Sequence, residues 1–168
     1  TSLNRWLLLH RAQRMGSYPG EDWQIDFTHM PKSRGTQYLL VSVDTFTNWV
    51  EAFPCRTERA SEVVRVLINE IIPCFGLPKY LQSDNGSSFK AAVTQGISKA
   101  LGIQYHFHCA WRPQSSRKVE KNDIIKRHLR KLSQETHLPW TTLLPMVLLW
   151  IRNTPSKLSL SPFEMLYG

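Results

Sequence analysis

The sequence predicts a mixed α/β domain built on a single sheet, and two observations lead to this prediction. Residues 22–54 contain three β-prone stretches joined by short turns, which is typical of an antiparallel meander. From residue 60 onwards the pattern alternates helix, strand, helix, strand and helices, which indicates parallel strands with helical crossovers. With 168 residues and 42% hydrophobic content, the chain can bury a substantial core. We therefore expect one α/β domain with a five-stranded mixed sheet, three antiparallel and two parallel strands, flanked by helices.

The first three strands are predicted from alternation and from apolar runs. In WQIDFT, residues 23–28, apolar residues alternate with polar ones, so Asp26 belongs to the polar face. Residues 30–35, MPKSRG, are a turn, and residues 38–44, YLLVSVD, suit a buried central strand. The third strand, residues 49–54, is closed by Pro54.

The remaining elements follow from helical spacing and from residues that break helices. Helical apolar spacing over residues 60–75 is followed by a fourth strand, KYLQS, and a helix that ends at Gly102. QYHFH, residues 104–108, is the predicted fifth strand, and two long helices, residues 116–137 and 140–153, come after it. The turn-rich stretch GSYPGE separates a linker, residues 1–20, from the domain, residues 21–168.

Charge and cysteine content narrow the class of protein. Lys and Arg outnumber Asp and Glu by 21 to 13, a net charge of +8, which favours a polyanionic partner, above all nucleic acid. The three cysteines form no CxxC pair, which predicts reduced thiols and an intracellular location, nuclear or cytoplasmic. The chain starts without Met and shows no signal-peptide pattern, so we expect a piece of a longer protein. The apolar runs are far shorter than the roughly 18 residues that a membrane span needs, so no membrane partner is expected.

Three carboxylates are candidates for a shared site. Asp26 lies on the polar face of the first strand, and Asp84 follows the fourth strand, so neighbouring strands would bring the two together. Close carboxylates repel unless a cation neutralises them, and a divalent metal ion is the usual solution. Asp84 also fits a second role, as a cap of the helix that follows it. Glu120 lies opposite the apolar side of a helix whose other charges are mostly basic.

Several motifs occur in a specific order along the chain. Thirty-five residues separate Asp84 from Glu120, which is a D,D(35)E spacing. The surrounding motifs are WQIDFT, YLLVSVDTFTNWVEAFP, QSDNGSSF, HCAWRPQSS and RNTPSKLSLSPFEMLYG. Together they resemble the catalytic cores of gammaretrovirus-type integrases, and the likeness extends from about residue 20 to residue 168.

The resemblance implies an RNase H-like fold and a metal-dependent activity on DNA. Asp26, Asp84 and Glu120 would be the catalytic acids and would hold two Mg²⁺ (or Mn²⁺) ions, with Asp26 shared between them. The implied reaction is polynucleotidyl transfer, in which water attacks during end-processing and a DNA 3′-hydroxyl attacks during strand transfer. Between Arg112 and Lys131 there are eight Lys or Arg against two acids, which suits phosphate contacts. The candidate DNA-binding residues are Arg112, Arg117, Lys121, Arg127 and Lys131.

The resemblance also implies a homodimer. The helix over residues 140–153 has an apolar face broader than one sheet should need, and such helices form dimer interfaces in the family. The residues of this face are Trp140, Leu143, Leu144, Val147, Leu148 and Ile151.

Two positions depart from the family pattern. Arg117 stands where the family has a glycine, and Arg does not adopt positive φ as readily. Asp123 stands where the family usually has asparagine, and its negative charge opposes phosphate binding. These departures suggest a host-captured copy of an endogenous retroviral integrase. They also leave open an alternative function, a catalytically weak or inactive core that binds nucleic acid or dimerises.

Three further features have alternative interpretations. Asp44 ends a strand, where a turn role is the default and a fourth site acid is the alternative. His106, His108 and Cys109 superficially suggest zinc, but no second ligand pair stands at finger spacing, so strand-end packing is preferred. Trp111 could stack on a nucleotide beside Arg112 or pack into the core.

Overall fold

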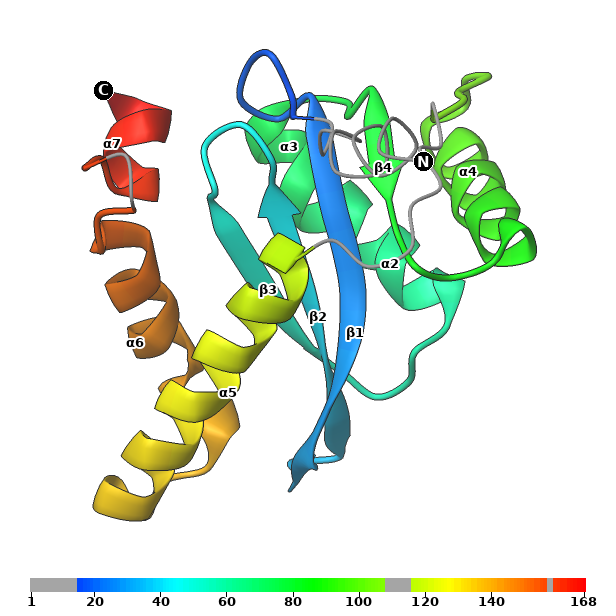
Figure 1. Cartoon of the computed structure of the whole chain (residues 1–168). Coiled ribbons are helices and arrows are strands. Elements are labelled where there is room, and N and C mark those ends of the chain that lie inside the picture. Colours follow the sequence, from blue (N-terminus) through cyan, green and yellow to red (C-terminus); the bar gives the residue numbers. More distant parts are fainter. Residues whose placement is uncertain (1–14, 108–115, 157–158) are drawn as a thin grey trace, which may run out of the picture.

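The computed structural model describes residues 15–107, 116–156 and 159–168, and helices cover both faces of a central sheet (Figure 1). Within these ranges the sheet has four strands in the order β3-β2-β1-β4. They are β1 (Asp22–Ser33), β2 (Thr36–Asp44), β3 (Val50–Cys55) and β4 (Tyr80–Gln82). β2 pairs with β1 and β3 in antiparallel fashion, and β4 runs parallel to β1. The mixed sheet, with its antiparallel meander, is as predicted.

The β1–β2 hairpin is longer than its sequence pattern predicts. β1 continues through the predicted turn to Ser33, and the turn itself is only Arg34 and Gly35, with φ of 48° and 78°. Two positive φ values are characteristic of the type I′ turns that match the twist of paired strands. The pairing shifts register between His29 and Ser33, around Pro31, which has no N–H to donate.

A first layer of helices covers one face of the sheet. α2 (Ala60–Val66), a π-helical turn η1 (Leu67–Ile71) and α3 (Ile72–Phe75) follow one another, and α4 (Ser87–Leu101) packs against α2. The π turn ends two residues before Pro73, where an α-helix would need an N–H that proline lacks. These helices bury Trp23, Ile25 and Leu40 of the sheet.

The opposite face is covered by α5 (Ser116–Thr136) and α6 (Trp140–Asn153), and α7 (Pro162–Tyr167) follows α6. None of the described helices is long and apolar enough to cross a membrane. The six residues of α6 predicted to form a dimer interface do not do so in this chain, because all six are buried in the core, where they pack against the sheet and α5. These buried residues are Trp140, Leu143, Leu144, Val147, Leu148 and Ile151.

The predicted fifth strand is not formed over its described part, residues 104–107. The backbone of Tyr105 is bonded to a side chain instead of to a neighbouring strand. Its N–H donates to the Ser98 hydroxyl at 3.1 Å, and its carbonyl accepts from the same hydroxyl at 3.0 Å. Since Ser98 lies in the last turn of α4, this segment is tied to the helix end. His108 and Cys109 lie outside the described residues.

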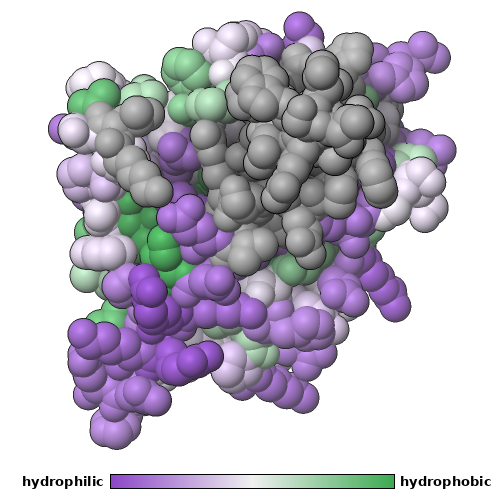
Figure 2. All heavy atoms as spheres, viewed as in Figure 1, coloured by the Kyte–Doolittle hydropathy of each residue, from purple (hydrophilic) through white to green (hydrophobic). Residues whose placement is uncertain are grey.

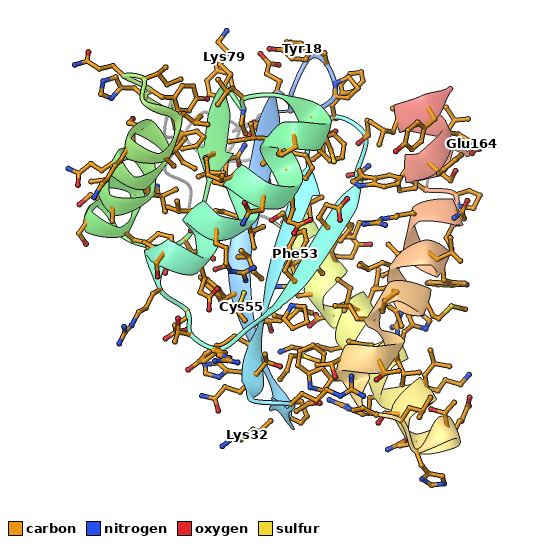
Figure 3. All side chains as sticks on the ribbon, turned by 180° about the vertical axis from the view of Figure 1, so that it is seen from behind. Tyr18, Lys32, Phe53, Cys55, Lys79 and Glu164 are labelled. Atoms are coloured by element: carbon orange, nitrogen blue, oxygen red, sulfur yellow. The ribbon has the colours of Figure 1, made fainter. Side chains whose placement is uncertain are left out.

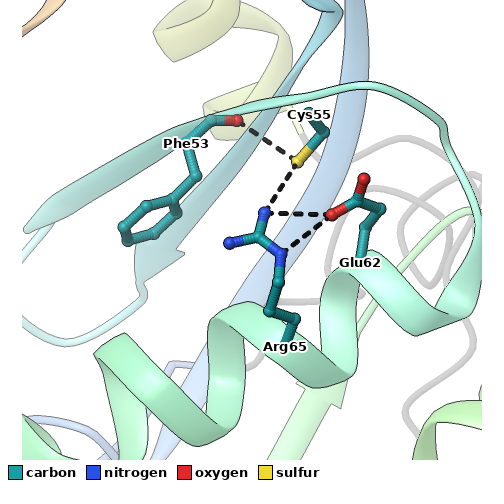
Figure 4. Close-up of polar contacts among 4 residues, drawn as sticks. All are labelled: Phe53, Cys55, Glu62 and Arg65. Atoms are coloured by element: carbon teal, nitrogen blue, oxygen red, sulfur yellow. Dashed lines mark hydrogen bonds and ion pairs between the residues drawn. The ribbon is translucent and has the colours of Figure 1, made fainter.

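Cys55 lies where α2 meets the end of β3 (Figure 4). Its thiol is 3.5 Å from the Phe53 carbonyl and 3.9 Å from an Arg65 nitrogen, and Arg65 forms an ion pair with Glu62 at 2.9 Å. Burial raises the pKa of Cys55 to about 11, with a smaller contribution in the same direction from Glu62. The thiol is therefore protonated at neutral pH and is a packing group, not a nucleophile.

Candidate active site

Asp26 lies in the middle of β1, on the face that the second helix layer covers. It pairs with Val41 of β2, and directly paired residues of antiparallel strands project to the same face. Val41 is buried in the core beneath α5 and α6. The Asp26 side chain is half-buried, and one of its oxygens accepts the N–H of Phe27 at 3.0 Å. The strand therefore points this carboxylate towards the α5 side, as its alternation predicts.

Asp84 follows β4, the strand that pairs with β1. The parallel register pairs Gln24 with Gln82, and the two aspartates stand two residues further along their respective chains. Asn85 donates its backbone and side-chain N–H groups to the Ser83 hydroxyl, at 3.2 Å and 3.0 Å, which shapes the turn that carries Asp84. Asp84 itself is exposed, and the N-cap of α4 is Gly86 with no side-chain cap. The N-cap position itself is therefore Gly86, two residues after Asp84.

A buried polar chain links β1 to β4 beneath the two aspartates, and sequence reasoning missed it. Gln82 donates to Asp22 at 2.7 Å, and Gln24 donates to Gln82 at 3.2 Å. All three side chains are almost fully buried, and Asp22 is 0% exposed. Hydrogen-bonded buried groups of this kind fix relative strand position. The sequence contained a sign of it, because alternate residues of a strand project to the same face. Asp22, Gln24 and Asp26 are alternate residues of β1, and Gln82 stands two residues before Asp84.

Glu120 lies in the second turn of α5, on the same side of the sheet as Asp26. α5 crosses this face of the sheet (Figure 1) and contacts β1. The Glu120 side chain is exposed. Among residues 15–107, 116–156 and 159–168, no three His, Cys, Asp or Glu side chains are grouped closely enough to hold a metal ion together. The register of β1 and β4 relates the positions of Asp26 and Asp84, and α5 carries Glu120.

The candidate DNA-binding residues differ in how far the structure describes them. Arg112 lies outside the described residues, and the side chain of Arg117 is likewise not described. Arg127 and Lys131 are exposed and lie within about 20° of Glu120 around the helix axis. Lys121 is half-buried, on the flank of the helix, and Asp123 is exposed. Basic side chains therefore share the outer face of α5 with Glu120.

The other acid and the histidine considered from sequence do not join this site. Asp44 is 1% exposed and its carboxylate accepts hydrogen bonds from the turn between β2 and β3. The turn role predicted for it is confirmed. His106 is exposed in the segment after α4.

Comparison with known proteins identifies the family. The model of the integrase core domain family matches residues 16–113. The Gag-Pol polyproteins of gibbon ape leukemia virus and koala retrovirus are 51% and 52% identical over 159 and 161 residues. These alignments cover 93% and 94% of the chain, which spans only 9% and 10% of the two polyproteins.

Solved structures give the same fold. The HTLV-2 integrase catalytic core domain, in complex with magnesium in a dimeric form, matches with a TM-score of 0.71 and 23% identity, over 90% of this chain and 99% of that one. A chain of the simian T-cell lymphotropic virus intasome, in complex with the PP2A regulatory subunit B56 gamma, matches with a TM-score of 0.75 and 24% identity, over 100% of this chain and 67% of that one. From the family match and the close gammaretroviral relatives, the chain belongs to the family of retroviral integrase core domains.

Proposed function

We propose that the chain is a polynucleotidyl transferase core that processes DNA ends and transfers DNA strands. The observation that supports this most is the register of β1 and β4, which pairs Gln24 with Gln82, each two residues before one of the aspartates. β1, the strand that carries Asp26, contacts α5, the helix that carries Glu120 and an exposed basic face. Acids for a metal site and cations for phosphates thus come from adjoining elements.

The donor set suits hard divalent cations. Asp26, Asp84 and Glu120 offer only carboxylate oxygens, which Mg²⁺ and Mn²⁺ prefer. Such ions, when bound, would supply charge stabilisation for the attacking and leaving oxygens of an in-line phosphoryl displacement. The magnesium complex of the HTLV-2 core supports this choice of ion.

The chain's own residues would position the DNA. Arg127 and Lys131 would contact phosphates along the outer face of α5, where both are exposed. The hydrogen bonds of Gln82 with Asp22 and Gln24 would hold the two strands that carry the aspartates. Ser83 would hold the turn at Asp84 through Asn85.

The test uses two substitutions that each remove one carboxylate from α5. Glu120→Gln should abolish Mn²⁺-dependent strand transfer on a short DNA duplex, and it should weaken Mg²⁺ binding in calorimetry. Glu135→Gln, at the exposed far end of the same helix, should leave both unchanged. Equal activity and equal metal affinity in the two variants would contradict the proposal.

The alternative function is a domesticated core that binds nucleic acid without catalysis. It is favoured by Asp123, which is exposed on α5 where the family usually has asparagine. For this function, DNA affinity should persist in Glu120→Gln and should fall steeply with salt. Replacing Arg127 and Lys131 by Ala should then reduce the log–log salt slope by about one unit for each lost phosphate contact.

We also propose a homodimer, through a different face of α6 from the one predicted. Met146, Leu149 and Trp150 are 61%, 56% and 50% exposed, which is unusual for large apolar side chains on one helix. In Figure 2 hydrophobic side chains gather in the region of α6, beside the hydrophilic C-terminal half of α5. The HTLV-2 core, described in a dimeric form, supports self-association.

A further inference from the structure

A pocket of about 450 Å³ lies on the α5 side of the sheet, away from the candidate active site. It is formed by the tip of the β1–β2 hairpin, the C-terminal half of α5 and the beginning of α6. Lys32 lies at the hairpin tip, at the end of the molecule where α5 ends and α6 begins (Figure 3). Arg130 is ten residues beyond Glu120, about 15 Å along the helix axis, so the pocket is separate from the acids.

The floor of the pocket is apolar and firmly held. Leu129 and Trp140 are 1% and 5% exposed and belong to the core beneath α5 and α6, and Met30 lies beside them. The Trp140 indole N–H donates to the Pro31 carbonyl at 2.7 Å, which ties the start of α6 to the hairpin. This bond joins two of the three walls, so we expect the pocket to keep its shape without a ligand.

The neutral polar groups of the walls are largely bonded within the protein. The Ser133 hydroxyl donates to the Leu138 carbonyl at 2.9 Å, and the Ser33 and Thr141 hydroxyls are 3.1 Å apart. With the indole N–H also used, the walls have few neutral donors and acceptors left to recognise a nucleobase.

The remaining polar groups at the walls are mainly cations. Lys32, Lys126 and Arg130 line the pocket, and no Asp or Glu does. No ion pair or side-chain hydrogen bond joins any of the three to another residue in the described part of the chain. Unpaired cations at the rim of an apolar pocket favour a ligand that combines negative charge with an apolar body.

We propose that this pocket binds a small organic anion with an aromatic or apolar body, such as an aromatic phosphate or carboxylate. The ring would lie against Leu129, Trp140 and Met30, and the anionic group would be bound by Lys126 and Arg130, with Lys32 at the mouth. The volume is within the usual range for small-ligand sites, roughly 300–1,000 Å³. The pocket does not depend on the proposed strand transfer, because it shares none of the residues assigned to that reaction.

The test is calorimetric titration of the protein with 1-naphthyl phosphate. A variant with Lys126→Gln and Arg130→Gln should bind it at least about tenfold more weakly, because it loses two charge-assisted contacts. The matched control carries Arg127→Gln and Lys131→Gln, which removes the same charge from the outer face of the same helix. It should bind 1-naphthyl phosphate like the wild type while losing DNA affinity.

Two further ligands and one further variant complete the design. Inorganic phosphate and the neutral 1-naphthol should each bind at least about tenfold more weakly than 1-naphthyl phosphate, since each lacks one half of the recognised chemistry. Gln134→Trp, at an exposed lining position, should obstruct the pocket without changing its charge. Circular dichroism establishes that every variant is folded. Equal weakening in both charge variants, equal binding of 1-naphthol, or unchanged binding in Gln134→Trp would overturn the proposal.

Discussion

At the scale of single residues, Asp44 is a buried carboxylate that organises a turn. Its oxygens accept hydrogen bonds from the Gly20 N–H at 3.1 Å, the Thr47 N–H at 2.9 Å and the Thr47 hydroxyl at 2.5 Å. The last two bonds close the turn between β2 and β3, and the first ties the segment before β1 to it. Three donors therefore depend on one side chain.

Replacing Asp44 by Ala should destabilise the fold without affecting metal binding. The three donors would be left buried without an acceptor, which should lower the free energy of unfolding by about 3 kcal/mol. Urea denaturation measures this loss, and Mg²⁺ titration of the folded variant measures the site. A variant that keeps its stability but loses Mg²⁺ affinity would show that Asp44 is a fourth site acid after all.

His128 is a residue whose protonation opposes folding. Burial lowers its pKa from the usual value of 6.5, and the charges of Arg127 and Lys131 lower the pKa further. Its ring packs on Trp150 of α6, with centroids 4.2 Å apart, and its Nε2 has no hydrogen-bond partner in the described part of the chain. The folded state therefore favours the neutral imidazole.

The lowered pKa of His128 should make the folded state less stable at acidic pH. Because the unfolded chain binds this proton more tightly, the contribution of His128 is complete above pH 6.5 and is lost as pH falls through the lower folded pKa. Urea midpoints measured at pH 7.5 and pH 5 should differ less in His128→Gln than in the wild type. His106→Gln, at an exposed histidine, should behave like the wild type. An unchanged difference in His128→Gln would contradict this assignment.

At the scale of elements, the contact between α2 and α4 depends on a missing side chain. A Cβ added at Gly96 would lie 2.6 Å from Cγ2 and 3.2 Å from Cγ1 of Val64. Val64 is β-branched and half-buried, so its methyl groups have little freedom to move. Glycine inside α4 lowers helix propensity, but it allows the two helices to approach.

Because of this contact, the effect of Gly96→Ala on the free energy of unfolding should depend on the residue at position 64. Gly96→Ala should lower the free energy of unfolding by about 1 kcal/mol, because the overlap with Val64 outweighs the gain in helix propensity. In a Val64→Ala background the same substitution should be neutral or stabilising, because the overlap is removed. A double-mutant cycle in urea measures the coupling. Additive effects would show that Val64 does not limit the approach of α4.

Local sequence patterns predict most elements well where one periodicity dominates. The alternation of Trp23, Ile25 and Phe27 correctly places Asp26 on the opposite face of β1, and Gly102 ends α4 at φ 65° as its position predicts. Tyr105 lies in an equally β-prone stretch, yet its backbone bonds to Ser98. That bond depends on where α4 ends in space, which no local pattern contains.

At the scale of the whole molecule, tertiary contacts decide what the sequence leaves ambiguous. The apolar spacing of α6 is the same whether its face meets the sheet or a second chain, and here it meets the sheet and α5. The pocket beside Arg130 joins residues about one hundred positions apart, 29–33 and 126–140, so no motif signals it. The pairing of the aspartates could be predicted only on the condition that the first and fourth strands are neighbours, which the order β3-β2-β1-β4 meets.

The exposed apolar side chains of α6 predict that whole molecules associate into a dimer. The large apolar residues of α6 divide into a buried face and an exposed set, Met146, Leu149 and Trp150. Burying such side chains on association stabilises a dimer by roughly 25 cal/mol for each Å² removed from water.

Leu149→Glu places a charge on this exposed face of α6 and should shift the chain to monomer in sedimentation equilibrium at low salt. Tyr18→Glu also replaces an exposed apolar side chain, but in the segment before β1, and should leave the dimer intact. If the wild type is already a monomer at the highest soluble concentration, or if Leu149→Glu still dimerises, the exposed face of α6 is not the interface.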